Sequence, residues 1–135
     1  MDVAGERKFI ETFINKASQD RLLYELSHIK KRARVLSRFS HSAEDYIKQE
    51  YIFSKASKCD ADGIALEIAK TTPKANSCYV ISDVFDGEFM SIETALHKCF
   101  DSGLASIIIF NDNLAFIKTE TEYVSATKYI LSKAF

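Results

Sequence analysis

Three histidines are the residues best suited to bind a metal ion, but their spacing does not support such a site. His28, His41 and His97 lie far apart in the sequence, without the HxxxH or HExxH spacing that places two ligands on one helix face. His28 and His97 are expected to be ordinary surface or boundary residues. We therefore expect no metal ion and no other cofactor.

The three cysteines, Cys59, Cys78 and Cys99, give no sign of nucleophilic catalysis. Cys99 and His97 would share one helix, where side chains two residues apart point roughly 200° away from each other and cannot hydrogen-bond. An odd number of cysteines, at spacings of 19 and 21, suits neither a disulfide framework nor a CxxC metal clamp. We expect reduced, buried thiols and no catalytic residue.

An acidic loop, Asp83-Val-Phe-Asp-Gly-Glu, is the most informative polar feature of the chain. It follows a predicted strand, at the edge of the sheet where α/β folds place their ligands. Its carboxylates lack the alternating positions and the distal glutamate of a calcium loop. Two interpretations stay open: a solvated Asp-Gly turn, or a partner-binding loop with aromatic anchors among its charges. The residues predicted to bind a partner are Asp83, Phe85, Asp86, Glu88 and Phe89.

A basic segment, Lys30-Lys-Arg-Ala-Arg, begins a second candidate surface. Long basic side chains on one helix face can contact phosphate groups, and a solvated helix face is the alternative interpretation. The candidate phosphate contacts are Lys30, Lys31, Arg34 and Arg38. With four glycines, the chain has neither a GxGxxG nor a GxxxxGK motif, and it lacks an RNA-binding aromatic signature. Nucleotide and RNA enzymes are therefore disfavoured.

The composition is that of an ordinary globular chain. Of its 135 residues, 47% are hydrophobic and 27% are charged, and the net charge is −1. Residues 1–57 carry eleven basic and eight acidic residues, whereas residues 58–135 carry seven and eleven. The charged start is unlike a signal peptide, and no apolar run approaches the roughly 18 residues of a membrane span. We expect a cytoplasmic protein that does not contact a membrane.

Apolar residues at helical spacing dominate the first half of the chain. The predicted helices cover about residues 6–16, a short run after Ser18, a run after Ser27, a run from Ser42 to about residue 52, and residues 60–71. Each of the three serines is predicted to be an N-cap, because its side-chain oxygen can accept a hydrogen bond from a backbone N–H of the first turn. The helix after Ser27 carries the basic side chains on its outer face.

Beta-prone runs appear only from Cys78 onward. The predicted elements are a strand over 78–82, a helix over 91–101, strands over 105–110 and 114–118, and an edge strand over 129–131, for which a terminal helix is the alternative. Ser91 is predicted to cap the helix at its start, and Gly103, in a left-handed conformation, at its end. The turn 111–113 is expected to use positive φ angles. The order strand, helix, strand predicts parallel pairing of 78–82 with 104–110, directly or with one strand between them.

These elements predict one domain of class α+β or α/β over residues 1–135. A helical layer, residues 1–72, is expected to pack on a small mixed sheet of strand, helix, strand and hairpin, residues 73–135. The two parts are layers of one domain because no linker separates them.

Several short segments together resemble a family of small uncharacterised bacterial cytosolic proteins that are immunity-protein-like. The segments are Arg21-Leu-Leu-Tyr-Glu-Leu-Ser, Lys30-Lys-Arg, Cys78-Tyr-Val-Ile-Ser and Asp86-Gly, followed by a short helix and a hydrophobic hairpin. The resemblance spans about residues 6–131 and rests on folding signals. The family has Gly or Pro in the hairpin turn, where this chain has Asn-Asp-Asn. The resemblance implies no known activity.

Three functions remain open. The first is a non-catalytic bacterial binding protein, such as an immunity protein that neutralises a toxin domain by occlusion, which needs only a complementary surface. The second is an accessory protein that binds nucleic acid through its basic helix. The third is a small enzyme whose minimum requirement would be a concave pocket holding His41 or Cys78 beside acidic residues. The partner of the first would be another protein, and the oligomeric state stays undetermined.

Overall fold

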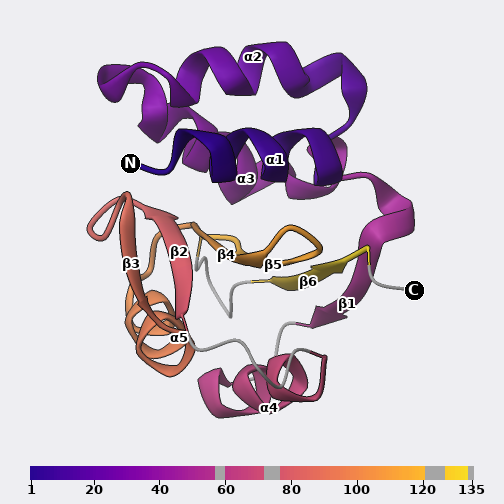
Figure 1. Cartoon of the computed structure of the whole chain (residues 1–135), viewed down its shortest axis with the longest axis vertical. Coiled ribbons are helices and arrows are strands. Elements are labelled where there is room, and N and C mark those ends of the chain that lie inside the picture. The colour runs from indigo at the N-terminus through magenta and orange to yellow at the C-terminus, as the bar shows by residue number, and fades with distance from the viewer. Residues whose placement is uncertain (57–59, 72–76, 121–126, 134–135) are drawn as a thin grey trace.

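Helices cover both faces of a central sheet in the computed structural model, which describes residues 1–56, 60–71, 77–120 and 127–133 (Figure 1). The α-helices are α1 (Val3–Phe13), α2 (Lys16–Leu26), α3 (Arg32–Tyr46), α4 (Ala61–Thr71) and α5 (Ile92–Asp101). Two short 3-10 helices, η1 (Ile29–Lys31) and η2 (Gln49–Tyr51), precede α3 and β1. Figure 1 shows α1, α2 and α3 on one side of the sheet, and α4 and α5 on the other.

Six strands form the sheet, in the order β1-β6-β5-β4-β2-β3, and every neighbouring pair is antiparallel. The strands are β1 (Ile52–Ala56), β2 (Ser77–Ser82), β3 (Glu88–Ser91), β4 (Ser106–Asn111), β5 (Leu114–Lys118) and β6 (Lys128–Ser132). The chain therefore has an α+β fold. Its first half is mainly helical, with α1, α2 and α3, as the sequence predicts.

Alternating side chains of the strands build a separate core on each face of the sheet. On β2, Tyr79 and Ile81 point into the core beneath α1, α2 and α3. Their neighbours Cys78 and Val80 point into the core beneath α4 and α5. This explains why β2, β4 and β5 are apolar along almost their whole length: both of their faces are buried.

Most of the helices and strands that the sequence predicts for the second half of the chain are confirmed. The helix predicted over 60–71 is α4, and the helix predicted over 91–101 is α5, whose cap Ser91 accepts a hydrogen bond from the backbone N–H of Thr94 at 3.2 Å. The strands predicted over 78–82, 105–110 and 114–118 are β2, β4 and β5. The last segment is strand β6, but its predicted edge position is wrong, because β6 pairs with both β1 and β5.

The predicted parallel pairing of 78–82 with 104–110 is wrong, because an unpredicted strand lies between them in the sequence. After Gly87, at φ 77°, the chain turns back and forms β3 against β2. Helix α5 then carries the chain across to β4, on the other side of β2. Helix α5 therefore connects β3 and β4, which run in the same direction but are not neighbours, and the sheet is not mixed.

The helix predicted from Ser42 to about residue 52 is also wrong. Helix α3 continues through Ser42, where it is kinked at φ −140° and ψ 34°, and ends at Tyr46. Residues 52–56 form the edge strand β1, which pairs with β6. The division at residue 72 fails for the same reason, because β1 joins the sheet and α4 packs beside α5 on the opposite face from α1, α2 and α3.

Three predicted caps and one turn differ from the structure. Asn15 rather than Ser18 precedes α2, and Ser27 ends α2 instead of opening the next helix. Helix α5 ends at Ser102 without a left-handed Gly103, since Gly87 alone has a positive φ among the described residues. The hairpin turn avoids positive φ because the Asn111 side chain accepts a hydrogen bond from the N–H of Asn113 at 2.8 Å.

Candidate functional site

A buried ion cluster around Arg32, at the start of α3, is the most elaborate polar arrangement of the described residues. The Arg32 guanidinium donates to both oxygens of Glu6, at 2.8 and 2.6 Å, and to both oxygens of Asp86, at 2.7 and 3.0 Å. It also donates to the backbone carbonyl of Leu26 at 2.9 Å. The side chains of Arg32 and Glu6 are each 5% exposed, and that of Asp86 is 24% exposed. The planar guanidinium thus meets two carboxylates in bidentate geometry.

Tyr79 extends the cluster to strand β2. Its hydroxyl donates to Glu6 Oε2 at 2.6 Å and accepts from the backbone N–H of Asp2 at 3.2 Å. Burial, followed by the hydrogen bond to Glu6, raises the pKa of Tyr79 to about 12. The hydrogen bonds that Arg32 donates to Glu6 hold the pKa of Arg32 above its usual range. Every charged group at the centre is therefore paired, as a buried charge requires.

The cluster joins three segments that are distant in the sequence. Glu6 belongs to the first turns of α1, Arg32 begins α3, and Asp86 lies in the loop between β2 and β3. Arg32 is 26 residues from Glu6 and 54 from Asp86. Sequence analysis missed Glu6 and Arg32, because no local pattern connects charges at such separations.

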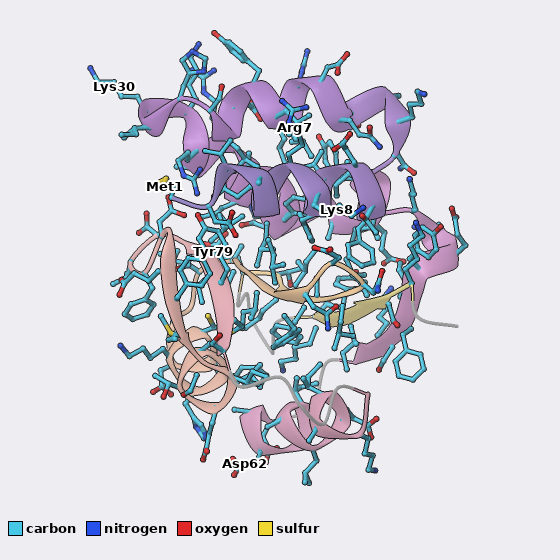
Figure 2. All side chains as sticks on the ribbon, viewed as in Figure 1. Met1, Arg7, Lys8, Lys30, Asp62 and Tyr79 are labelled. Carbon is cyan, nitrogen blue, oxygen red and sulfur yellow. The ribbon has the colours of Figure 1, made fainter. Side chains whose placement is uncertain are left out.

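Four large apolar side chains are exposed around this cluster. Val3 is 69% exposed, Ile29 82%, Val84 64% and Phe89 63%. Each lies within three residues of Glu6, Arg32 or Asp86 along the chain, so the backbone at all four positions is near the cluster. Figure 2 shows Met1 and Lys30 at one end of the molecule, with Tyr79 beneath the start of α1. We call Val3, Ile29, Val84 and Phe89 the Arg32-end patch.

The structure divides the predicted partner-binding residues of the acidic loop into two groups. Asp83, Glu88 and Phe89 are exposed, and the Phe89 ring packs 4.9 Å from the ring of Tyr79. Asp86 is held by Arg32. Phe85 is half-buried against the core beneath α5, with Lys98 Nζ 4.8 Å from its ring centre. Asp86 and Phe85 therefore anchor the loop, while the other three residues face outward.

The four basic candidates differ in their contacts within the protein. Arg38 donates to both oxygens of buried Glu25, at 2.9 and 2.8 Å, which lowers the pKa of Glu25. Lys31 donates to the Tyr24 hydroxyl at 2.6 Å and lies 4.4 Å from the centre of its ring. Lys30 and Arg34 are exposed. Two of the four cations are thus engaged within the protein.

A cavity of about 420 Å³ at the kink of α3 supplies the pocket that the enzyme hypothesis requires. His41 lines it, with Nε2 3.6 Å from Glu120 Oε2, beyond hydrogen-bond distance. Glu44, on the same wall, accepts from Lys55 at 2.5 Å and from the Tyr129 hydroxyl at 2.9 Å. The Ser40 hydroxyl donates to the Leu36 carbonyl at 2.9 Å. The enzyme hypothesis stays a prediction.

The remaining candidate residues occupy structural positions. The His28 ring packs 4.4 Å from that of Tyr24, and His97 Nε2 lies 3.0 Å from Asp62 Oδ1 at the surface. Cys78 and Cys99 are buried and free, and burial raises the pKa of Cys78 to about 12, so its thiol is protonated at neutral pH. Cys59 lies outside the described residues.

Within the described ranges, neither a metal-binding cluster nor a membrane-spanning helix occurs. No group of three or more His, Cys, Asp or Glu side chains there is arranged to hold a metal ion. None of the helices in those ranges has the length and apolar character needed to cross a bilayer.

The comparisons with known proteins leave the family assignment open. The resemblance to small bacterial proteins therefore stays a prediction. No protein-family model, curated protein or solved structure matches this chain.

Proposed function

We propose that this chain is a non-catalytic binding protein whose Arg32-end patch contacts another protein. The observation that carries the proposal is the gathering of Val3, Ile29, Val84 and Phe89 around one buried ion cluster. They come from α1, η1, the β2–β3 loop and β3. Together with Met1, which is 63% exposed and whose side chain lies 3.0 Å from the Cβ position of Gly87, they are five of the nine large hydrophobic side chains that are exposed among the described residues. Exposed apolar groups concentrated in this way typically mark an interaction site.

The cluster also gives the patch the rigidity that favours binding. Asp86 fixes the β2–β3 loop through two hydrogen bonds to Arg32, and the loop is fixed again by the Ser82 hydroxyl, which accepts from the N–H of Phe85 at 2.9 Å. A surface that is already ordered loses less conformational entropy when it binds. Charges of both signs surround the apolar residues, including Lys30, Asp83 and Glu88. An apolar centre with a polar rim is the usual anatomy of a protein interface.

Within this proposal, the partner is a toxin domain that the protein neutralises by occlusion. Such an activity requires a rigid complementary surface and no catalytic group. The resemblance to small immunity-protein-like bacterial proteins supports the same partner. A toxin encoded beside this gene would be the first protein to test.

Site-specific photo-crosslinking in cells of the source organism tests the proposed surface. A photoreactive phenylalanine analogue is placed at Val84, Ile29 or Leu66, where Leu66 is the control because it is 64% exposed on α4, across the sheet from α1. We expect one protein to crosslink at Val84 and Ile29 but not at Leu66. The purified partner should then bind the wild type, and Val84→Asp should weaken binding at least about tenfold.

Two outcomes would contradict this proposal. One is a crosslinked protein that is captured equally from all three positions. The other is a captured protein whose affinity is unchanged by Val84→Asp and Ile29→Asp.

A further inference from the structure

A cavity of about 170 Å³ lies between α1 and the face of the sheet that α1 covers. Its floor is apolar, because Phe9 of α1 and Tyr79 of β2 are 2% and 3% exposed and Ile109 of β4 is half-buried. Tyr79 and Ile109 are partners in the register of β2 with β4. Since a cavity of about 150 Å³ can hold benzene, this one has room for a single small apolar group.

Exposed charges of both signs line the same cavity. Lys8 comes from α1, and Asp112 belongs to the turn between β4 and β5. Asp2, the N-cap of α1, adds a second carboxylate, which accepts a hydrogen bond from the backbone N–H of Gly5 at 2.9 Å. Within the described ranges, Lys8 and Asp112 form no ion pair with each other or with any other residue. The cavity therefore offers a cation and an anion that neither neutralise each other nor are neutralised by described neighbours.

We propose that this cavity binds a free α-amino acid with a small aliphatic side chain, such as leucine, isoleucine or valine. The α-carboxylate accepts a hydrogen bond from the Lys8 ammonium, and the α-ammonium group donates to the Asp112 carboxylate. The aliphatic side chain lies on the floor that Phe9, Tyr79 and Ile109 form. Hydrogen bonds between charged groups are roughly twice as strong as those between neutral ones, so these two contacts supply both affinity and orientation.

The charges of the cavity favour a zwitterion over a simple anion or cation. An anion without an ammonium group would meet the carboxylates of Asp112 and Asp2, which repel it. A cation without a carboxylate would place a second positive charge in the cavity that Lys8 lines. An α-amino acid carries both groups on neighbouring atoms and satisfies both charges of the protein.

The floor and the volume of the cavity favour a small aliphatic side chain. The Tyr79 hydroxyl is already engaged, since it donates to Glu6 and accepts from the N–H of Asp2. A polar side chain on this floor would therefore lose hydrogen bonds to water without replacement, at a cost of about 1–3 kcal/mol. The cavity is also smaller than the roughly 300–1,000 Å³ of pockets for drug-sized ligands, which disfavours tryptophan and other large side chains.

Isothermal titration calorimetry of the whole protein with leucine, isoleucine and valine tests the inference. We expect at least one of them to bind, with one molecule per chain. Two derivatives of that amino acid then test each charge separately: the amide lacks the carboxylate, and the N-acetyl derivative lacks the ammonium group. Each derivative should bind at least about tenfold more weakly than the amino acid itself.

Two substitutions at exposed positions assign these charges to residues of the protein. Lys8→Met should weaken binding of the amino acid at least about tenfold and remove its preference over the amide. Asp112→Asn should weaken binding similarly and remove the preference over the N-acetyl derivative. The matched controls Lys16→Met and Asp101→Asn remove the same charges at exposed positions outside the cavity, and both should leave binding unchanged.

The inference is overturned if none of the three amino acids binds at millimolar concentration, or if either derivative binds as tightly as the amino acid. Wild-type affinity in both Lys8→Met and Asp112→Asn would overturn it as well, and so would tighter binding of a polar or large aromatic amino acid. The inference does not rest on the proposed function, because Phe89 is the only residue of the Arg32-end patch that lines the cavity. The crosslinking experiment and this titration can therefore fail separately.

Discussion

At the scale of the residue, Arg32 holds the largest number of separate segments together. Its five N–H donors reach two carboxylates and one backbone carbonyl. The sequence marks Arg32 only as one of several basic residues, and Asp86 only as part of an Asp-Gly turn. Their pairing could not be predicted, because it depends on how α1, α3 and the β2–β3 loop meet in space.

Replacing Arg32 by methionine should strongly destabilise the protein. The carboxylates of Glu6 and Asp86 would remain buried without their counter-ion, which typically costs about 3–5 kcal/mol in the free energy of unfolding. Urea denaturation measures this change. Arg34→Met is the matched control, since Arg34 is exposed on the same helix and should change stability by no more than about 0.5 kcal/mol. Equal effects of the two variants would show that the cluster does not stabilise the fold.

Lys118 is a second buried charge, and it makes folding stability depend on pH. It is 1% exposed and donates to the carbonyls of Ser102 and Leu104, just after α5, at 2.9 and 2.8 Å. Burial lowers its pKa below the ordinary value of 10.5. Between the lowered pKa and 10.5, the unfolded chain binds more protons than the folded one, so the contribution of Lys118 to stability increases as pH rises through this window.

The measurement for Lys118 compares the wild type with Lys118→Met by urea denaturation at several pH values. The variant should be less stable throughout, by about 1–3 kcal/mol, because the carbonyls of Ser102, Leu104 and Thr119 lose a donor. The difference should grow as pH approaches 10.5 from below, since only the wild type carries the titrating amine. A difference that shrinks over this range would contradict the assigned direction of the pKa.

At the scale of the element, the sequence predicts a strand best where both faces of that strand are buried. Strands β2, β4 and β5 are buried on both faces, and their apolar runs identify them directly. The edge strands β1 and β3 carry polar and exposed residues, so nothing in their composition separates them from a helix end or a loop. Missing β3 reversed the predicted direction of pairing between β2 and β4, and with it the mixed character of the sheet.

Gly87 supplies the positive φ in the turn that precedes β3. Its φ of 77° is a conformation that other residues adopt at a cost, and a Cβ there would lie 3.0 Å from the Met1 side chain. We expect Gly87→Ala to lower the free energy of unfolding by about 1–2 kcal/mol. Gly103→Ala is the control, because Gly103 has an ordinary φ and nothing within 4 Å of its added Cβ, and it should be neutral or stabilising by up to about 1 kcal/mol. Thermal or urea denaturation of both proteins checks this, and a larger loss at Gly103 would contradict the turn geometry.

At the scale of the whole molecule, the sheet separates two hydrophobic cores that have different surroundings. The core beneath α1, α2 and α3 borders the ion cluster, the patch and the edge strand β3. The core beneath α4 and α5 packs against the opposite face of the sheet. The sequence draws attention to the acidic loop because the charge and aromatic content of the loop are visible in it, and its role in binding a partner stays a prediction. The opposite wall of the proposed contact surface, formed by α1 and η1, was not visible.

The contact between Met1 and Gly87 has a practical consequence for experiments. The Met1 side chain lies against the β2–β3 loop, so any residues fused ahead of Met1 would emerge next to Val84 and Phe89. An affinity tag left at this position would therefore obstruct the proposed contact surface. Binding assays call for protein from which such a tag has been cleaved, or for one that never carried it.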